Sequence, residues 1–184
     1  CDLSPAQEEV DALRSFLNEG GKWFGLHGTN ALIEFVGEMQ IVDGLEIPGK
    51  TDTPNKNPEL MELLGSRFVA HPPNMSIKVK VNDKSHPITK DLNDFEIFDE
   101  PYYCEFSDGI KVLLESRYTD DADAYVNSSW KEDIPRPQMY LHKVGKGGVL
   151  YLMLGHCRGK YDMRPFMDEC PVDRGGWDSE VFYE

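Results

Sequence analysis

Titratable side chains follow three short apolar runs of this sequence. His27 ends the first run, the acidic pair Asp99 and Glu100 ends the second, and His156 comes directly after the third. Because active sites in α/β sheets lie at the carboxyl ends of strands, we expect these side chains at one sheet edge. Two imidazoles and a carboxylate there either bind a divalent metal such as zinc or act as acid and base near neutral pH.

The segment around His27 has the pattern of a nucleophile elbow. Residues 22–27 read as a short buried strand, glycines flank the corner that follows, and residues 30–39 read as a helix. A strand, a tight turn and a helix in this order lift one side chain over the end of a sheet. The lifted residue is His27, so the sequence predicts the frame of a nucleophile enzyme without serine or cysteine at its tip.

Other polar and aromatic residues are candidates for substrate binding. His71 and His86 each precede proline, and they either contact a substrate or only fix the geometry of rigid turns. Tyr102 and Tyr103 offer aromatic faces on which a sugar ring can stack, although isolated aromatic residues also serve ordinary packing. His142 lies inside a predicted strand, and we interpret it as structural.

The remaining elements predict a mixed sheet covered by helices. Ser4 is expected to cap a helix that ends at the glycine pair 20–21, and a second helix begins at Asn57 and ends near residue 65. A loop is predicted over residues 42–57, and a polar, Asp-rich excursion over residues 119–137. Strands are predicted over residues 77–82, 95–103, 110–118, 139–144 and 149–154, the last two joined by a hairpin turn.

Composition narrows the class of partner. The chain has 184 residues, enough for one domain, and a formal net charge of −14. This charge repels phosphate backbones and anionic lipids, so nucleic acid and membrane surfaces are not expected partners. The four cysteines lack metal-knuckle spacing, and reduced thiols in the cytoplasm are expected. The chain does not begin with methionine, so we expect a segment of a longer protein, for which a periplasmic or secreted location stays open.

Several motifs together resemble the ThuA-like family, named for trehalose utilisation. Residues 20–27 (GGKWFGLH) resemble that family's GGG-x-x-x-LH segment. Further matches follow in the family's order: Leu64-Gly65 with Phe68, residues 71–73 (HPP), 86–89 (HPIT), 95–102, 145–147 and 149–156. The resemblance covers residues 5–160.

This resemblance implies an α/β, flavodoxin-like fold of the class I glutamine amidotransferase type. The expected architecture is a three-layer sandwich with a mixed, mostly parallel sheet and a late β-hairpin. Residues 1–184 then form a single ThuA-like domain that lacks its N-terminal βαβ unit and its C-terminal helix. His27 resembles the position of the amidotransferase cysteine and His156 that of its histidine, with Arg158 in place of glutamate. Without the elbow thiolate no glutaminase activity is expected.

The resulting functional hypothesis is a sugar-metabolising enzyme acting on a sugar or an oxidised (keto) sugar. The expected catalytic residues are His27, His156, Glu100 and Asp99, with His27 and His156 as metal ligands if a divalent ion is used. Isomerisation, epimerisation and hydrolysis all stay open. Two alternatives are a non-catalytic carbohydrate-binding module and an assembly domain on a decayed amidotransferase-like fold. The expected partner is a small-molecule sugar, and a homodimer is compatible with the sequence.

Overall fold

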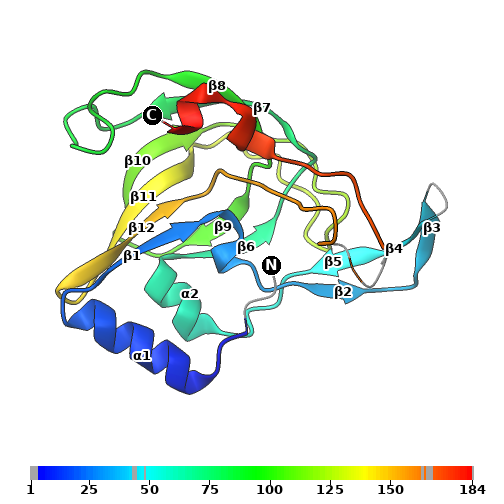
Figure 1. Cartoon of the computed structure of the whole chain (residues 1–184), viewed down its shortest axis with the longest axis horizontal. Coiled ribbons are helices and arrows are strands. Elements are labelled where there is room, and N and C mark those ends of the chain that lie inside the picture. The colour runs from blue at the N-terminus through cyan, green and yellow to red at the C-terminus, as the bar shows by residue number, and fades with distance from the viewer. Residues whose placement is uncertain (1–3, 43–44, 48, 163, 165–167, 184) are drawn as a thin grey trace.

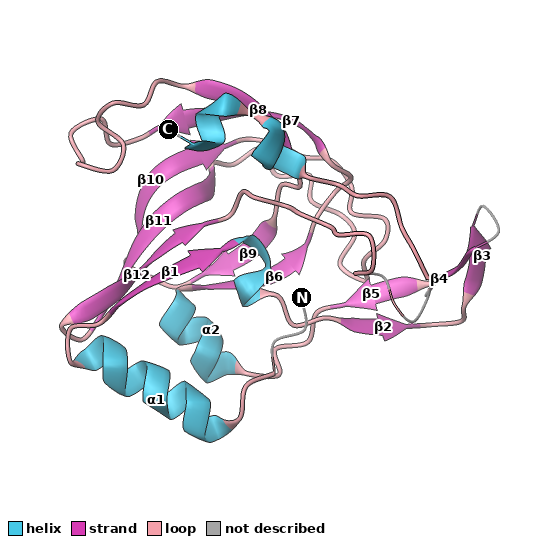
Figure 2. Cartoon of the chain, viewed as in Figure 1, coloured by secondary structure: helices cyan, strands magenta, loops and turns pink. Residues whose placement is uncertain are grey.

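The computed structural model describes residues 4–42, 45–47, 49–162, 164 and 168–183. Figures 1 and 2 show the arrangement of the elements in this part of the chain. The elements are α1 (Gln7–Asn18), β1 (Lys22–Leu26), the 3₁₀ turn η1 (His27–Asn30), β2 (Glu34–Val36), β3 (Gln40–Val42), β4 (Leu45–Ile47), β5 (Lys50–Asp52), α2 (Pro58–Leu64), β6 (Ser66–Ala70), β7 (Met75–Val81), β8 (Phe95–Asp99), β9 (Tyr103–Phe106), β10 (Lys111–Ser116), β11 (Arg136–Val144), β12 (Gly147–Leu152), and the 3₁₀ turns η2 (Gly175–Asp178) and η3 (Glu180–Tyr183).

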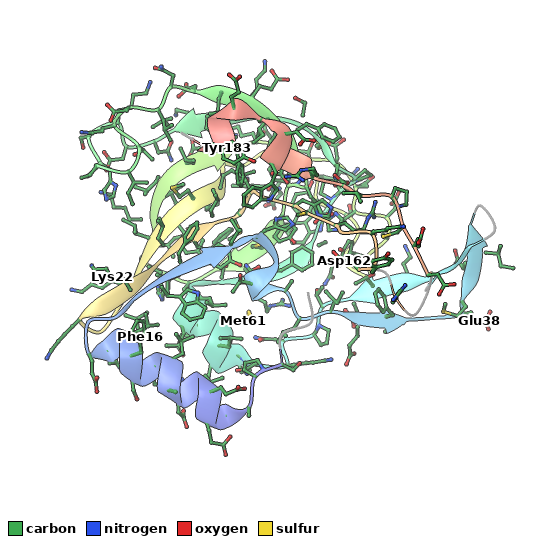
Figure 3. All side chains as sticks on the ribbon, viewed as in Figure 1. Phe16, Lys22, Glu38, Met61, Asp162 and Tyr183 are labelled. Carbon is green, nitrogen blue, oxygen red and sulfur yellow. The ribbon has the colours of Figure 1, made fainter. Side chains whose placement is uncertain are left out.

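The main sheet is curled and has six strands in the order β1-β12-β11-β10-β7-β8. Helices α1 and α2 lie beside each other on one side of it, and η2 packs near β8 (Figure 1). Met61 of α2, labelled in Figure 3, is buried in the core that this packing forms. Within the described residues, no helix is long and apolar enough to cross a bilayer.

The predicted α/β class, the mixed sheet and the late hairpin are confirmed. The expectation of a mostly parallel sheet is wrong for the described strands, because β1 and β12 are the one parallel pair in the six-stranded sheet. The β11–β12 connection is a tight turn. Parallel neighbours need a long crossover connection, whereas a hairpin places consecutive strands antiparallel.

Strand direction nevertheless brings the polar ends together. The pairings make β1, β12, β10 and β8 run in the same direction. Their carboxyl ends therefore lie at the same edge of the sheet, and the curl draws the two outer strands toward each other (Figure 1). This edge carries the candidate site.

The predicted helix over residues 30–39 is wrong. The turn η1 ends at Asn30, and β2 then pairs antiparallel with β5. The predicted loop over residues 42–57 is likewise only partly correct, because it contains β4 and β5. A short apolar run does not distinguish helix from strand by periodicity, and here the pairing across the loop decided the outcome.

Three smaller corrections concern element ends. Helix α1 begins after Ala6 instead of Ser4, and the Glu9 carboxylate accepts the Ala6 backbone N–H at 2.8 Å. The predicted strand over residues 95–103 ends at Asp99, and the chain resumes in β9. Strand β9 pairs with β6, a strand that the sequence analysis did not identify.

Candidate functional site

The turn after β1 has the backbone of an elbow. His27 has a φ of +42°, and it is the one non-glycine residue in the left-handed region among the residues described here. This conformation is costly for a residue with a side chain and is typical of functional turns. The Tyr151 hydroxyl holds the turn by donating to the His27 carbonyl at 2.6 Å and accepting from the Asn30 backbone N–H at 2.8 Å. A 3₁₀ turn takes the place of the helix expected after the elbow.

Three histidines converge on the carboxylate of Glu100. His27 Nε2 lies 3.2 Å from Glu100 Oε2, and His156 Nδ1 lies 3.2 Å from the same oxygen. His71 Nε2 lies 3.2 Å from Oε1. Glu100 and His27 are buried, and the other two imidazoles are partly exposed. The strand ends therefore bring the predicted residues His27, Glu100 and His156 together, with His71 added from the end of β6.

In each of these histidines, the ring nitrogen that does not face Glu100 lies beside another oxygen atom. His27 Nδ1 donates to the Met153 carbonyl at 2.8 Å, and His71 Nδ1 donates to the Pro72 carbonyl at 2.7 Å. His156 Nε2 lies 3.6 Å from a carboxylate oxygen of Asp173. In the neutral form of His27 and His71, the nitrogen facing Glu100 then carries a lone pair instead of a proton. A lone pair facing a carboxylate is stable only with a cation or a proton between them.

Burial and charge act in opposite directions on these groups. Burial lowers the pKa of His71, and the nearby Glu100 charge does not offset this effect. Burial also favours a lower pKa for His156, but hydrogen bonding to Glu100 and the charges of Glu100, Asp173 and Asp99 raise that pKa above its ordinary value. For Glu100, burial acts to raise the pKa, but the imidazoles of His156, His27 and His71 hold it well below the usual range. Glu100 is thus a carboxylate at neutral pH.

The donor set fits a divalent metal ion. The nearest ligand atoms of His27, Glu100 and His156 all lie within 4.8 Å of one another. A tetrahedral zinc site with bonds of about 2.0–2.1 Å places its ligand atoms about 3.3 Å apart, close to the separations around Glu100. Metal-binding histidines also donate their other nitrogen to a carbonyl or a carboxylate. His27, His156 and Glu100 can therefore hold such an ion, with His71 beside the other carboxylate oxygen.

Asp99 lies beneath this centre and is fully buried. Its Oδ1 accepts the backbone N–H groups of Glu100 at 2.7 Å and His156 at 3.0 Å. Its Oδ2 accepts those of Gly155 at 2.8 Å and Gly176 at 3.2 Å. These bonds make Asp99 a positioning residue that ties two strand ends to the C-terminal segment.

Of the four predicted substrate-binding residues, two lie at the histidine cluster and two lie away from it. Tyr102 covers His27 with a ring centroid distance of 4.2 Å, and His71 belongs to the centre itself. Tyr103 stacks on Trp130 at 4.6 Å and donates its hydroxyl to the Asp120 carbonyl, away from the histidine cluster. His86 is held in its own turn, where its Nδ1 accepts the Ile88 N–H at 3.3 Å. The site thus contains one of the two predicted histidines and one of the two predicted tyrosines.

Two residues near the centre were missed by the sequence analysis. Tyr125 packs against His71 with centroids 5.0 Å apart, and Asp173 faces His156. Both lie in loops, where periodicity gives no signal. His142, interpreted as structural, hydrogen-bonds the Glu62 carbonyl at 3.0 Å. Cys104, Cys157 and Cys170 are free thiols, and Cys1 lies outside the described residues.

The charge of Glu100 should be measurable through His156. In metal-free protein we expect an NMR titration to give His156 a pKa above 6.5, because the Glu100 and Asp173 carboxylates favour its charged form. In Glu100→Gln the pKa of His156 should be lower than in wild type, because the hydrogen bond and the charge of Glu100 no longer oppose burial. The stability contributed by the raised pKa is present below pH 6.5 and is lost as pH rises through the folded-state pKa. An unchanged titration in the variant would contradict this electrostatic account.

The fold and the site together define an α/β protein with a mixed, curled sheet, a histidine–carboxylate centre and no nucleophile at its elbow. The profile of the ThuA family, described as trehalose utilisation, matches residues 47–170. This is more than half of the chain and includes His71, Glu100 and His156. The chain therefore belongs to the ThuA family.

Solved structures support the fold. A ThuA-like protein from Bacteroides uniformis has a TM-score of 0.57 and 20% identity over 88% of this chain. Another from Parabacteroides merdae has a TM-score of 0.52 and 17% identity over 85% of this chain. The chain spans 60% and 57% of the lengths of these two proteins. No curated protein was found to match it.

Proposed function

We propose that this protein is a sugar-metabolising enzyme that acts on a sugar or a keto-sugar derivative by metal-assisted chemistry. The observation that carries the proposal is the convergence of His27, His71 and His156 on the buried carboxylate of Glu100. The family description, trehalose utilisation, supports a sugar as the substrate class.

The hydrogen bonds of the histidines favour a metal over a simple acid–base pair. His27 donates from Nδ1 to the Met153 carbonyl, which leaves the lone pair of its Nε2 free to bind a cation beside Glu100. A general base would need its free nitrogen to face the substrate instead of a carboxylate. A bound divalent ion would supply Lewis-acid polarisation of a sugar carbonyl or hydroxyl.

The chain's own residues then orient the substrate and move protons. His156 lies between the Glu100 and Asp173 carboxylates, and its side chain is partly exposed. With its Nδ1 toward Glu100, its Nε2 can hold a proton on the side of Asp173. Tyr102 lines the centre with an aromatic face. This arrangement suits isomerisation, epimerisation or hydrolysis.

Glutaminase chemistry does not fit the site. The elbow residue is an imidazole, and the nearby Cys104 thiol is partly buried. Burial raises the pKa of Cys104 to about 12, which keeps it protonated and unreactive at neutral pH.

Turnover and binding of trehalose, glucose and their keto derivatives test the proposal. We expect zinc- or manganese-loaded protein to convert at least one of these sugars. NMR in ²H₂O measures the conversion. His27→Ala should lower kcat/KM at least about 100-fold, as expected for the loss of a metal ligand. His142→Gln, a histidine change outside the site, should leave turnover unchanged. Sugar binding that persists without turnover and survives His27→Ala would instead support the carbohydrate-binding module.

A further inference from the structure

We propose that Tyr125 is a ligand-binding residue of this site, and that its hydroxyl donates a hydrogen bond to an oxygen atom of the molecule held beside Glu100. This inference rests on the proposed function for the nature of that molecule, an oxygen-rich small compound. It assigns a role to the polar excursion over residues 119–137, which the family motifs do not include.

The backbone around Tyr125 is fixed against a neighbouring strand. Thr51 of β5 donates its N–H to the Ala124 carbonyl at 2.8 Å and accepts the Val126 N–H at 2.9 Å. The Tyr125 N–H bonds to the Ala122 carbonyl at 2.9 Å. Tyr125 itself is 7% exposed, whereas Ala124 and Val126 on either side are exposed. The Tyr125 side chain is therefore directed inward, while its two chain neighbours face solvent.

The Tyr125 ring forms part of the wall around the centre. It packs edge-on against His71, with centroids 5.0 Å apart, and against Phe68 at 5.7 Å. Burial raises the pKa of the Tyr125 hydroxyl well above its ordinary value, and the charge of Glu100 raises it further. The hydroxyl consequently stays protonated at neutral pH, so it can donate.

The hydroxyl of Tyr125 has no hydrogen-bond partner among the residues that the structure describes. By contrast, the buried hydroxyls of Tyr118, Tyr140 and Tyr151 donate to backbone carbonyls. The fully buried polar side-chain atoms without a partner in the described residues belong to Asn30, Ser116 and Gln138 and not to Tyr125. The Tyr125 hydroxyl therefore stays accessible at the wall of the centre, where a ligand oxygen can reach a donor that no described residue uses.

Tyr125→Phe isolates the hydroxyl because it keeps the ring that packs on His71 and Phe68. Calorimetry measures the binding of three probes. Acetohydroxamate is titrated into zinc-loaded protein, and trehalose and glucose are titrated into both zinc-loaded and metal-free protein. For any probe that wild type binds, we expect the affinity of Tyr125→Phe to be about 2- to 10-fold lower. This is the effect of losing one hydrogen bond. Zinc content and the thermal midpoint should not change. Tyr161→Phe, on an exposed ring beside Arg164, is the matched control and should bind as wild type does.

The outcomes separate this inference from the proposed function. Acetohydroxamate binding that weakens in Tyr125→Phe, without any sugar binding, supports the role of Tyr125 and overturns the sugar assignment. Equal affinities in wild type and Tyr125→Phe overturn the role of Tyr125 and leave the sugar assignment standing if a sugar binds. Loss of zinc or of thermal stability in Tyr125→Phe overturns the ligand role in favour of a structural one. Failure of wild type to bind any probe overturns both.

Discussion

Glu100→Gln is expected to abolish stoichiometric metal binding. Glu100 is the one residue that all three histidines face, and it supplies the negative charge that offsets a divalent cation. The glutamine amide removes that charge and directs N–H groups toward imidazole nitrogens. Since even partners outside the coordination sphere change metal affinity about 10- to 100-fold, loss of this ligand should cost at least about 100-fold. Mass spectrometry for metals on protein purified without chelator, with a competition titration for affinity, measures the effect.

Glu105→Gln is the matched control for this experiment. Glu105 is exposed and pairs with Arg67, so the same chemical change there should leave metal content as in wild type. Zinc retained in Glu100→Gln would mean that the ion is bound elsewhere. Wild-type protein without any metal would instead leave the histidines as proton carriers around a shared carboxylate.

The core of the candidate site could be predicted from the sequence because it follows strand ends. His27, Glu100 and His156 are far apart along the chain, yet each follows an apolar strand. Strands β1, β8 and β12 run in one direction, and their carboxyl ends share one edge. The rule held although most neighbouring strands are antiparallel, because it depends on strand direction and not on which strands pair.

The choice between the two adjacent carboxylates could have been made from alternation. In β8, Ile97 and Asp99 are buried whereas Glu96 and Phe98 between them are exposed. Successive side chains of a strand point to opposite faces, so Asp99 belongs to the core face with Ile97. Asp99 is therefore occupied by backbone N–H groups, and Glu100, just beyond the strand, is free to reach the histidines.

The contributions of His71, Tyr125 and Asp173 could not be predicted in the same way. His71 follows β6, which pairs with β9 outside the six-stranded sheet and was not identified as a strand. Tyr125 is held against β5, and Asp173 is bridged to Arg158. Such positions depend on contacts between distant loops, for which neither periodicity nor spacing gives a signal.

Asp99→Asn should be the most destabilising conservative substitution at the site. The carboxylate accepts four backbone N–H groups in a fully buried position. An amide keeps one accepting oxygen and directs an NH₂ group at the other two donors, which leaves two N–H groups unpaired. At about 1–3 kcal/mol for each buried unpaired group, the free energy of unfolding should fall by about 2–6 kcal/mol. Urea denaturation followed by circular dichroism measures this loss.

The pattern of damage distinguishes a positioning role from a catalytic one. The unpaired N–H groups are those of Glu100 and His156 if the amide nitrogen replaces Oδ1, or those of Gly155 and Gly176 if it replaces Oδ2. Either pair holds a strand end that carries a ligand, so Asp99→Asn should also weaken metal binding by displacing Glu100 or His156. Asp108→Asn, on an exposed turn residue, should change the free energy of unfolding by no more than about 0.5 kcal/mol. Wild-type stability with lost turnover in Asp99→Asn would contradict the positioning role and return Asp99 to the reacting groups. Lost stability and weakened metal binding together would show that one buried carboxylate fixes both strand ends that carry the site.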